Sequence, residues 1–490
     1  MTNSSISNYY IGKNVLITGA TGFMGKVLVQ KLLHDCCEIS KIYILVRPKK
    51  GIDSEQRCLD YKNHIVFEKI RQEMPLQLDK IQMIKGDVTM DNLGLNSSDE
   101  KELIENVNII FHCAANVRFD LTLKDATNFN LKGTLRVLTL AEKMQSLNSF
   151  VHVSTSYCNC DEVVLEEKYY PAKVDPFTVI EMIDTMSDDA LKSVTPKLLG
   201  KLPNTYALTK GYSEDLVNSY RKKFPIVIAR PPIVVASWKE PFPGFIEGVN
   251  GPTGLMIGAA KGVIRSMHCN PKYPSEAIPV DIIINCLIAL AFKRSLIKNE
   301  EVFYCNITDS GTNSLTWGES LELGKKIFYK YPLSTTCLYY PNGSMKSNYF
   351  LHTLCIIFTH YLPAYIIDGI LYIFGYETFL VNIQKRISQG LKVLQYYTTR
   401  EWLFKNENFR KLRDDMNAID QQRFYCDLSK IDYNDYILNY ILGIRKFILN
   451  ESLSSLPKAR AKLMRLYYID KLLKIFFCGL IIYIIYNLLK

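Results

Sequence analysis

The chain has 490 residues, of which 48% are hydrophobic and 22% charged, and its formal net charge is +10. This length exceeds what one hydrophobic core usually organises, and the composition excludes a largely disordered chain. The basic residues are spread out and form no recognisable nucleic-acid-reading module, so the charge favours an acidic small molecule or an anionic membrane surface over nucleic acid. The 13 cysteines form no repeated C-x-x-C framework, which predicts free thiols and no metal site.

The first pattern in the chain is NVLITGATGFMG, residues 14–25. A β-branched strand is predicted over 14–18, and Gly19, Gly22 and Gly25 follow at G-x-x-G-x-x-G spacing before a helix over 26–33. A strand, a glycine turn and a helix N-terminus in this order bind anions, because the backbone can approach a pyrophosphate and the helix dipole favours its charge. We therefore expect a dinucleotide at this turn.

A second strand is predicted over 41–46, followed by Arg47, Lys49 and Lys50. NAD-binding folds usually carry an Asp or Glu here for the ribose 2′-hydroxyl. An arginine backed by two lysines suits a 2′-phosphate instead, so we expect NADPH. The other interpretation is a solvated basic loop.

Two more strands are predicted over 81–88 and 108–115. The first ends near Asp87, whose carboxylate could meet the adenine edge of a dinucleotide. The second ends in small residues, among them Ala114, which let the backbone lie against the cofactor. His112 is expected to be a packed strand residue and not a catalyst.

A helix containing Asn130 is expected over 125–146, and a fifth strand over 149–155 brings Ser154 and Thr155 to its C-terminal end. Ligands bind at that edge of open α/β sheets. The alternation of strands and helices predicts a Rossmann-type, doubly wound parallel sheet of the α/β class.

Tyr206 and Lys210 stand four residues apart, so on a helix they share one face and reach the same site. A free tyrosine has a pKa of about 10, and a nearby ammonium would lower it towards the working range of a proton donor. Thr155, or failing it Ser154, would hydrogen-bond the substrate oxygen and fix it against the tyrosine. This set suits hydride transfer from reduced nicotinamide to a carbonyl carbon, with no metal.

These motifs resemble an extended short-chain dehydrogenase/reductase and, more narrowly, the eukaryotic fatty acyl-CoA reductases. The matching stretches run from residue 15 to about residue 450 and are TGATGFMGKVLVQKLL, YILVRPKKG, FHCAANVRFD, HVSTSYCN, NTYALTK, ARPPIVVASWKEPFPGF, VNGPTGL, HYLPAYIIDG, EWLF and GIRKFIL. The resemblance implies a cytosol-facing, membrane-associated oxidoreductase. It would reduce long-chain acyl-CoA with NADPH to a primary alcohol, through an aldehyde reduced at the same site, and release CoA.

The resemblance also implies roles for individual residues. The catalytic residues would be Thr155, Tyr206 and Lys210, with Asn130 as a relay member. The cofactor would be lined by Gly19, Thr21, Gly22, Phe23, Met24, Gly25 and Arg47, and we expect Asp87, Ala114, Tyr206 and Lys210 to join them. Phe245 stands where the family often has tryptophan, which leaves the shape of the acyl pocket open.

The second half begins with a strand predicted over 225–235, and the loops after it, WKEPFPGF and GVNGPTGL, are expected to help build the substrate site. Residues 279–291 are expected to return to the sheet body. We place an NADP-binding reductase domain at 10–340 and a C-terminal helical domain at 349–450.

Two apolar stretches could meet a membrane. Residues 472–489 are at the short edge of what spans a bilayer, and basic residues precede them, which would keep the body of the protein in the cytosol. The alternative is a buried or interfacial helix. Endoplasmic reticulum, peroxisome and lipid droplet are all compatible with this anchor.

The other stretch, 349–374, is strongly apolar but is interrupted by His352, His360, Pro363 and Asp368. This favours helices that bury an acyl chain or dip into the membrane interface, with a re-entrant segment as the other interpretation.

Two other functions fit part of the sequence. A membrane-anchored reductase acting on sterols would share the cofactor site and the Tyr-Lys pair, but would not be expected to carry the helical C-terminal domain. A non-catalytic NADP-binding scaffold would have no need of Tyr206 and Lys210.

Overall fold

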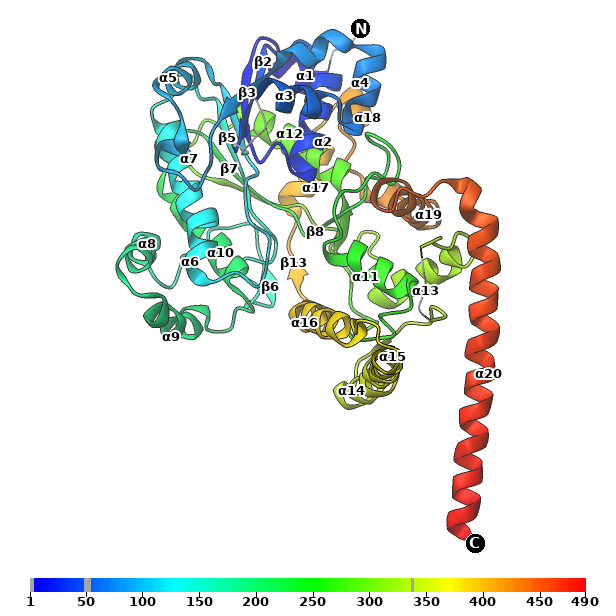
Figure 1. Ribbon diagram of the computed structural model, residues 1–490. Helices are drawn as coiled ribbons and strands as arrows, with labels where there is room; N and C mark the ends of the chain where they lie inside the picture. The colour runs from blue at the N-terminus through cyan, green and yellow to red at the C-terminus, as the bar shows by residue number, and fades with distance from the viewer. Residues whose placement is uncertain (1–3, 48–53, 336–338) are drawn as a thin grey trace. The chain divides into compact units, whose positions relative to one another are not determined.

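The computed structural model describes residues 4–47, 54–335 and 339–490 (Figure 1). Contacts divide the chain into two compact units, each gathered from three stretches. The first unit comprises Met1–Phe242, Glu276–Ser314 and Trp402–Ile431, and the second comprises Pro243–Ser275, Leu315–Glu401 and Asp432–Lys490. The division into 10–340, 349–450 and 472–489 stays a prediction beside these interleaved units.

The first unit is built on a seven-stranded parallel sheet in the order β11-β7-β5-β4-β1-β2-β3. The order reverses between β1 and β4, and open sheets of this kind bind ligands beyond the carboxyl ends of the strands at that point. The strands are β1 (Asn14–Thr18), β2 (Lys41–Val46), β3 (Ile81–Lys85), β4 (Ile109–His112), β5 (Ser149–Val153), β7 (Ile226–Arg230) and β11 (Phe303–Asn306).

Both faces of this sheet are buried, which is why its strands are continuous apolar runs. Leu16, Ile110 and Phe150 join a core cluster with side chains of α7 (Gly133–Glu142) and α10 (Thr205–Ser219). Their neighbours along the strands point to the opposite face, where α2 (Phe23–Asp35) and α12 (Val280–Leu296) pack against each other. The unit also contains α1 (Ser5–Tyr9), α3 (Ser54–Lys62), α4 (Glu68–Glu73), α5 (Ser97–Asn106), α6 (Leu123–Ala126), α8 (Pro176–Thr185), α9 (Asp188–Leu199), α17 (Glu407–Asp414) and α18 (Ala418–Arg423).

The predicted strands 14–18 and 41–46 are confirmed, and four other strand predictions need correction. The strands predicted over 81–88, 108–115 and 149–155 end earlier, at Lys85, His112 and Val153, because loops begin there. The strand predicted over 225–235 is two strands.

Pro231 and Pro232 cause that break, since proline cannot donate to a strand ladder. After them β8 (Ile233–Val235) pairs with β10 (Ala277–Pro279) in a separate sheet. Residues 279–291, expected to return to the sheet body, supply the end of β10 and most of the buried helix α12, which packs against β5 and β7. The helix predicted over 125–146 is interrupted by a π-helical turn at Thr127–Lys132.

A short strand pair brings a late stretch of chain into the first unit. In it β13 (Leu403–Phe404) pairs in parallel with β6 (Val164–Leu165). Trp402 Nε1 also donates to the Cys160 carbonyl at 3.1 Å. The segment Trp402–Ile431 therefore packs with the sheet that precedes it by hundreds of residues.

The second unit is mostly helical, with one parallel pair formed by β9 (Ser266–His268) and β12 (Ser344–Lys346). Its helices are α11 (Gly251–Ala260), α13 (Trp317–Phe328), α14 (Tyr349–Ile356), α15 (Leu362–Ile373), α16 (Leu380–Thr398), α19 (Tyr433–Gly443) and α20 (Leu456–Leu489). A π-helical turn, Ile357–Tyr361, joins α14 to α15. Across the described residues, one helix is long and apolar enough to cross a membrane, namely Tyr349–Ile373.

Candidate active site

The glycine turn between β1 and α2 lies against the end of β4. Gly19 has a φ of +75°, and a Cβ atom there would stand 2.8 Å from the Ala114 amide nitrogen. A Cβ atom on Gly25 would stand 2.3 Å from the Gly19 carbonyl oxygen. Only glycine fits at both positions, so the predicted residues Gly19, Gly25 and Ala114 are brought together by close backbone packing.

The first turn of α2 suits an anionic ligand. Gly22 is its N-cap, and no side chain of the described residues caps it. Thr21 and Gly22 are exposed, while Phe23 and Met24 are half-buried in the first turn. A pyrophosphate would fit this cradle, because backbone N–H groups at a helix N-terminus point outwards and carry partial positive charge.

Two more predicted cofactor residues follow β2 and β3. Arg47 is exposed directly after β2, while Lys49 and Lys50 lie outside the described residues. The Asp87 carboxylate accepts hydrogen bonds from the amide and the hydroxyl of Thr89, each at 2.9 Å. Both side chains therefore follow the carboxyl ends of neighbouring strands, as the sequence predicted.

The catalytic candidates meet where β5 ends. Ser154 and Thr155 are buried immediately after this strand, and the Thr155 hydroxyl is near enough to the Tyr206 phenol to lower its pKa. The first turn of α10 places Tyr206 there, because the Asn204 side chain caps that helix by accepting from the Ala207 amide at 2.9 Å. The side chain of Tyr206 is half-buried, and its ring lies 5.5 Å from that of Phe119.

Lys210 lies one turn further along α10 and is 2% exposed. Its Nζ donates to the Val153 carbonyl at 2.7 Å and lies 3.4 Å from His152 Nε2. Burial lowers the pKa of Lys210 to about 8, although Glu214 and two cysteines oppose this shift. This lysine can therefore exchange a proton close to neutral pH.

The pKa of Tyr206 differs from the expectation. Burial raises the pKa of the phenol above its usual value, Cys158 adds to the rise, and the Thr155 hydroxyl opposes it only in part. Lys210 is not among the groups that shift this pKa, so the predicted lowering by its ammonium does not occur, and loss of solvation dominates. A phenol with a raised pKa is protonated at neutral pH, which is the form that can donate a proton.

Asn130 lies in the π-helical turn and is buried. Its Oδ1 accepts from the Asn116 amide at 2.8 Å, and its Nδ2 donates to the Asn116 carbonyl at 3.2 Å and to Thr209 Oγ1 at 3.1 Å. The side chain thus holds the loop after β4 against α10. Its role as a relay member stays a prediction.

His112 is tied into the fold as expected of a packed strand residue. Its Nδ1 lies 2.7 Å from Thr18 Oγ1 and its Nε2 lies 3.1 Å from Thr134 Oγ1. Burial, aided by Lys210, lowers the pKa of His112 to about 3. The imidazole is therefore neutral and links β1, β4 and α7.

Sequence reasoning missed a buried ion pair beside the site. Arg230, the last residue of β7, lies 2.6 Å from Glu214, and both side chains are almost completely buried. Arg230 also donates to the carbonyls of Glu166 and Lys168, each at 2.9 Å. The available signal was that Glu214 stands four residues after Lys210, on the same face of α10.

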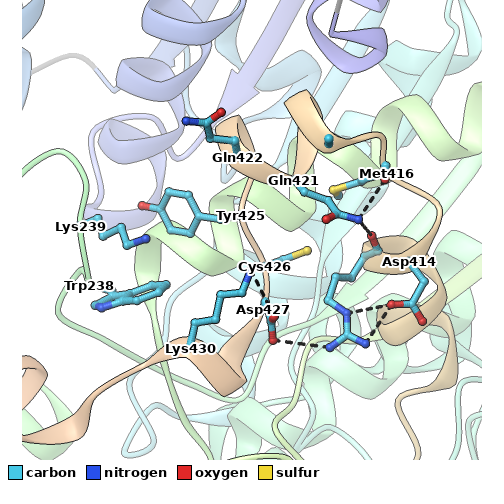
Figure 2. A pocket seen from close by; sticks show the side chains of 12 residues that line it. Trp238, Lys239, Asp414, Met416, Gln421, Gln422, Tyr425, Cys426, Asp427 and Lys430 are labelled. Carbon is cyan, nitrogen blue, oxygen red and sulfur yellow. Dashed lines mark hydrogen bonds and ion pairs between the residues drawn. The ribbon is translucent and has the colours of Figure 1, made fainter. Parts of the chain in front are cut away.

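A hollow of about 590 Å³ lies in the first unit (Figure 2). Lys239 Nζ stands 3.9 Å from the ring centroid of Trp238 and 4.7 Å from that of Tyr425. Arg413 is paired there with Asp414 and Asp427. The residues that line this hollow are different from the predicted catalytic and cofactor residues.

Across the parts of the chain that the structure describes, no group of three or more His, Cys, Asp or Glu side chains could hold a metal ion. The candidate reactive groups near the end of β5 are the Thr155 hydroxyl, the Tyr206 phenol and the Lys210 ammonium.

Solved structures share this fold at low sequence identity. The reductase domain of a nonribosomal peptide synthetase from Mycobacterium tuberculosis matches with a TM-score of 0.60 and 16% identity, over 92% of this chain and 97% of that one. The terminal R domain of the myxalamid PKS-NRPS pathway matches with a TM-score of 0.58 and 14% identity, over 92% and 93% of the two chains.

Comparison of the sequence with known proteins identifies the family, which the solved structures of low identity do not. An NAD-binding family model described as male sterility protein matches residues 17–287, and a Sterile model of the same description matches 359–451. Fatty acyl-CoA reductase 1 of Xenopus laevis is 39% identical over 94% of this chain and 90% of its own length. The human protein of that name is 38% identical over the same shares, and a putative fatty acyl-CoA reductase of Drosophila melanogaster is 36% identical over 94% and 91%. The chain therefore belongs to the fatty acyl-CoA reductase family, described by its domain models as male sterility proteins.

Proposed function

We propose that this protein reduces long-chain fatty acyl-CoA to a primary fatty alcohol, using two molecules of NADPH and releasing CoA. The observation that carries the proposal is that Thr155 and Tyr206 meet at the end of β5, one helical turn from the buried Lys210. The glycine turn that suits a dinucleotide belongs to the same unit. Relatives named fatty acyl-CoA reductase support the substrate class.

The residues have distinct tasks in this reaction. A bound NADPH would supply hydride to the carbonyl carbon. The Thr155 hydroxyl would hold the thioester oxygen, and the Tyr206 phenol would stabilise the negative charge that this oxygen gains. The C–S bond then breaks, CoA leaves as the thiolate and takes up a proton, and an aldehyde is formed.

The aldehyde would be reduced by a second hydride at the same site. Tyr206 would donate its proton to the aldehyde oxygen, which becomes the alcohol hydroxyl. Lys210, with a pKa of about 8, would then help to return a proton to the phenolate from solvent. Each of the two reductions thus consumes one hydride and one proton.

NADPH in preference to NADH is part of the proposal. Arg47 is exposed directly after β2, where a guanidinium could pair with a 2′-phosphate. The alternative, a solvated basic loop, would leave the enzyme without preference between the two dinucleotides.

We also propose that the protein is held on a membrane with its catalytic body in the cytosol. The support is the apolar end of α20, residues 472–489, preceded by basic residues. Endoplasmic reticulum, peroxisome and lipid droplet all suit such a tail.

The test is NADPH oxidation by the purified protein with a series of acyl-CoAs of increasing length, with lipid products identified by mass spectrometry. We expect fatty alcohol from the wild type and a loss of about 100-fold or more in Tyr206→Phe, because general acid catalysis is usually worth that much. Cofactor binding without turnover of any acyl-CoA would refute the proposal. Turnover of hydroxysteroids would then favour the sterol-type reductase, and a cellular function unchanged by Tyr206→Phe would favour the scaffold.

A further inference from the structure

A continuous helix, Tyr349–Ile373, is formed by α14, the π-helical turn and α15. It buries its polar side chains and exposes its large apolar ones, the reverse of a helix on the surface of a soluble protein. Its polar side chains are buried, with His352, His360 and Asp368 only 6%, 1% and 8% exposed. Its large apolar side chains face outwards, and Phe350 and Phe358 are 68% and 62% exposed. A helix on a water-facing surface has the opposite arrangement.

The buried polar groups attach this helix to the second unit along its length. His352 Nδ1 lies 2.9 Å from Ser266 Oγ, and His360 Nε2 accepts from the amides of Arg265 and Ser266 at 2.9 and 3.3 Å. Asp368 accepts from three successive amides at the start of α16, at 2.9 to 3.2 Å. These hydrogen bonds fix the rotation of the helix about its axis, so its apolar side is held facing outwards.

The outward side forms what we call the apolar face, defined by Phe350, Phe358, Leu362, Tyr365, Ile366 and Ile370. Each of these side chains is at least 46% exposed. A contiguous apolar surface of this kind is unfavourable in water and indicates a contact with lipid or with a partner.

The neighbouring helix α16 favours lipid over a protein partner as the group that covers the apolar face. It packs against α15 (Figure 1) and exposes Lys385, Arg386 and Lys392. Cations beside an apolar face complement anionic headgroups above acyl chains, as in helices that lie in a membrane interface. A phospholipid bilayer satisfies both features of this surface at once.

We propose that the apolar face lies in the headgroup–acyl boundary of an anionic bilayer, parallel to its plane. The helix is long enough to cross, but crossing would carry β9, β12 and the charged side chains of Arg265 and Lys346 into the hydrocarbon, which is costly. This inference deepens the membrane association proposed above by naming a second contact besides the end of α20. It needs nothing from the reductase chemistry.

The test places tryptophan probes in the full chain and measures quenching by brominated lipids in vesicles of phosphatidylcholine and phosphatidylserine. The variant Phe358→Trp reports on the apolar face, Tyr483→Trp on the end of α20, and Leu76→Trp on an exposed site of the first unit. We expect quenching of Phe358→Trp to be several-fold above that of Leu76→Trp. Bromines near the headgroup should quench it more strongly than bromines near the chain ends.

Three results would overturn the inference, and one of them separates it from the proposed tail anchor. Quenching of Tyr483→Trp with none in Phe358→Trp would leave the tail in the membrane and refute the apolar face. Stronger quenching of Phe358→Trp by the deep bromines would mean that the helix crosses. Cross-linking of Phe358→Cys to itself without vesicles, with no lipid quenching of Phe358→Trp, would assign the face to a second copy of the chain.

A charge variant tests the choice of lipid. The double substitution Lys385→Glu and Arg386→Glu should reduce quenching of Phe358→Trp several-fold in vesicles that contain phosphatidylserine. It should have little effect in pure phosphatidylcholine. Equal quenching in both kinds of vesicle, with and without the substitutions, would refute the anionic requirement.

Discussion

The buried pair Glu214–Arg230 gives the sharpest prediction about stability. The two side chains are 2% and 3% exposed, and two guanidinium nitrogens of Arg230 lie within hydrogen-bond distance of the carboxylate. Glu214→Gln would keep the shape of the side chain and remove its charge, which leaves the guanidinium buried without a counterion. Breaking one partner of such a pair costs about 3–5 kcal/mol. We expect Glu214→Gln to lower the free energy of unfolding by about 3 kcal/mol.

Urea denaturation measures this loss, with two controls. Lys223 and Glu142 form an exposed pair, 57% and 40% exposed, so Glu142→Gln should change stability by less than about 1 kcal/mol. The double variant Glu214→Gln, Arg230→Met removes both charges and should recover much of the loss. A double variant no more stable than Glu214→Gln would refute the explanation by an unpaired charge.

The same pair predicts a dependence on pH. Burial alone would raise the pKa of Glu214, but Arg230 outweighs it and holds the pKa below the ordinary 4.5. A carboxylate with a lowered pKa stabilises the fold fully above its unfolded value, and this contribution is lost as the pH falls through the folded value. The stability difference between wild type and Glu214→Gln should therefore be constant near neutral pH and shrink below about pH 4.5.

Three further predictions each concern a single residue. Gly443→Ala should lower the free energy of unfolding by about 1–3 kcal/mol, since the new Cβ would stand 1.8 Å from the Gly244 carbonyl oxygen. A thermal melt measures this loss, and an unchanged melting temperature would contradict this packing. Gly19→Ala should weaken dinucleotide binding in a fluorescence titration, because its φ is +75° and Ala114 is too close; unchanged affinity would show that the turn adapts. Arg47→Glu should raise KM for NADPH at least about tenfold and leave KM for NADH nearly unchanged; equal effects would refute recognition of the 2′-phosphate.

The strands that could be predicted are those whose limits are set by neighbouring residues in the sequence. Residues 14–18 and 41–46 are buried apolar runs bounded by turn residues, and both strands have the predicted limits. The predicted strands 81–88 and 108–115 were too long because small residues after a strand carry no signal of where pairing stops. Two adjacent prolines do carry such a signal, and Pro231–Pro232 is where the strand predicted over 225–235 breaks.

The parts of the site that could be predicted are those in which spacing along one helix or turn brings the residues together. Three glycines at fixed spacing define the turn, and Tyr206 and Lys210 share a face because α10 is helical. The partnership of Glu214 with Arg230 links two different elements, and the pairing of β13 with β6 joins stretches more than 200 residues apart. Such contacts depend on the packed structure and cannot be derived from local pattern alone.

The direction of the pKa shift at Tyr206 has a consequence for the reaction. Burial favours the neutral phenol over the phenolate, and it is the largest influence on the pKa of Tyr206. A neutral phenol is ready to give a proton to a carbonyl oxygen as hydride arrives, whereas oxidation of an alcohol would need the phenolate as a base. In the proposed mechanism, reduction therefore finds its acid, Tyr206, in the protonated form at neutral pH.

Lys210 predicts how the reaction depends on pH. Because burial lowers its pKa to about 8, it carries its proton below that pH and loses it above. We expect kcat for aldehyde reduction to fall above about pH 8, since Lys210 can then no longer return a proton to Tyr206. Oxidation of fatty alcohol with NADP⁺ should rise over the same range, because neutral Lys210 can take the proton from the phenol. Initial rates in both directions between pH 6 and 10 measure this, about two units either side of the Lys210 value. If both directions followed the same pH profile, protonation of this pair would not control the chemistry.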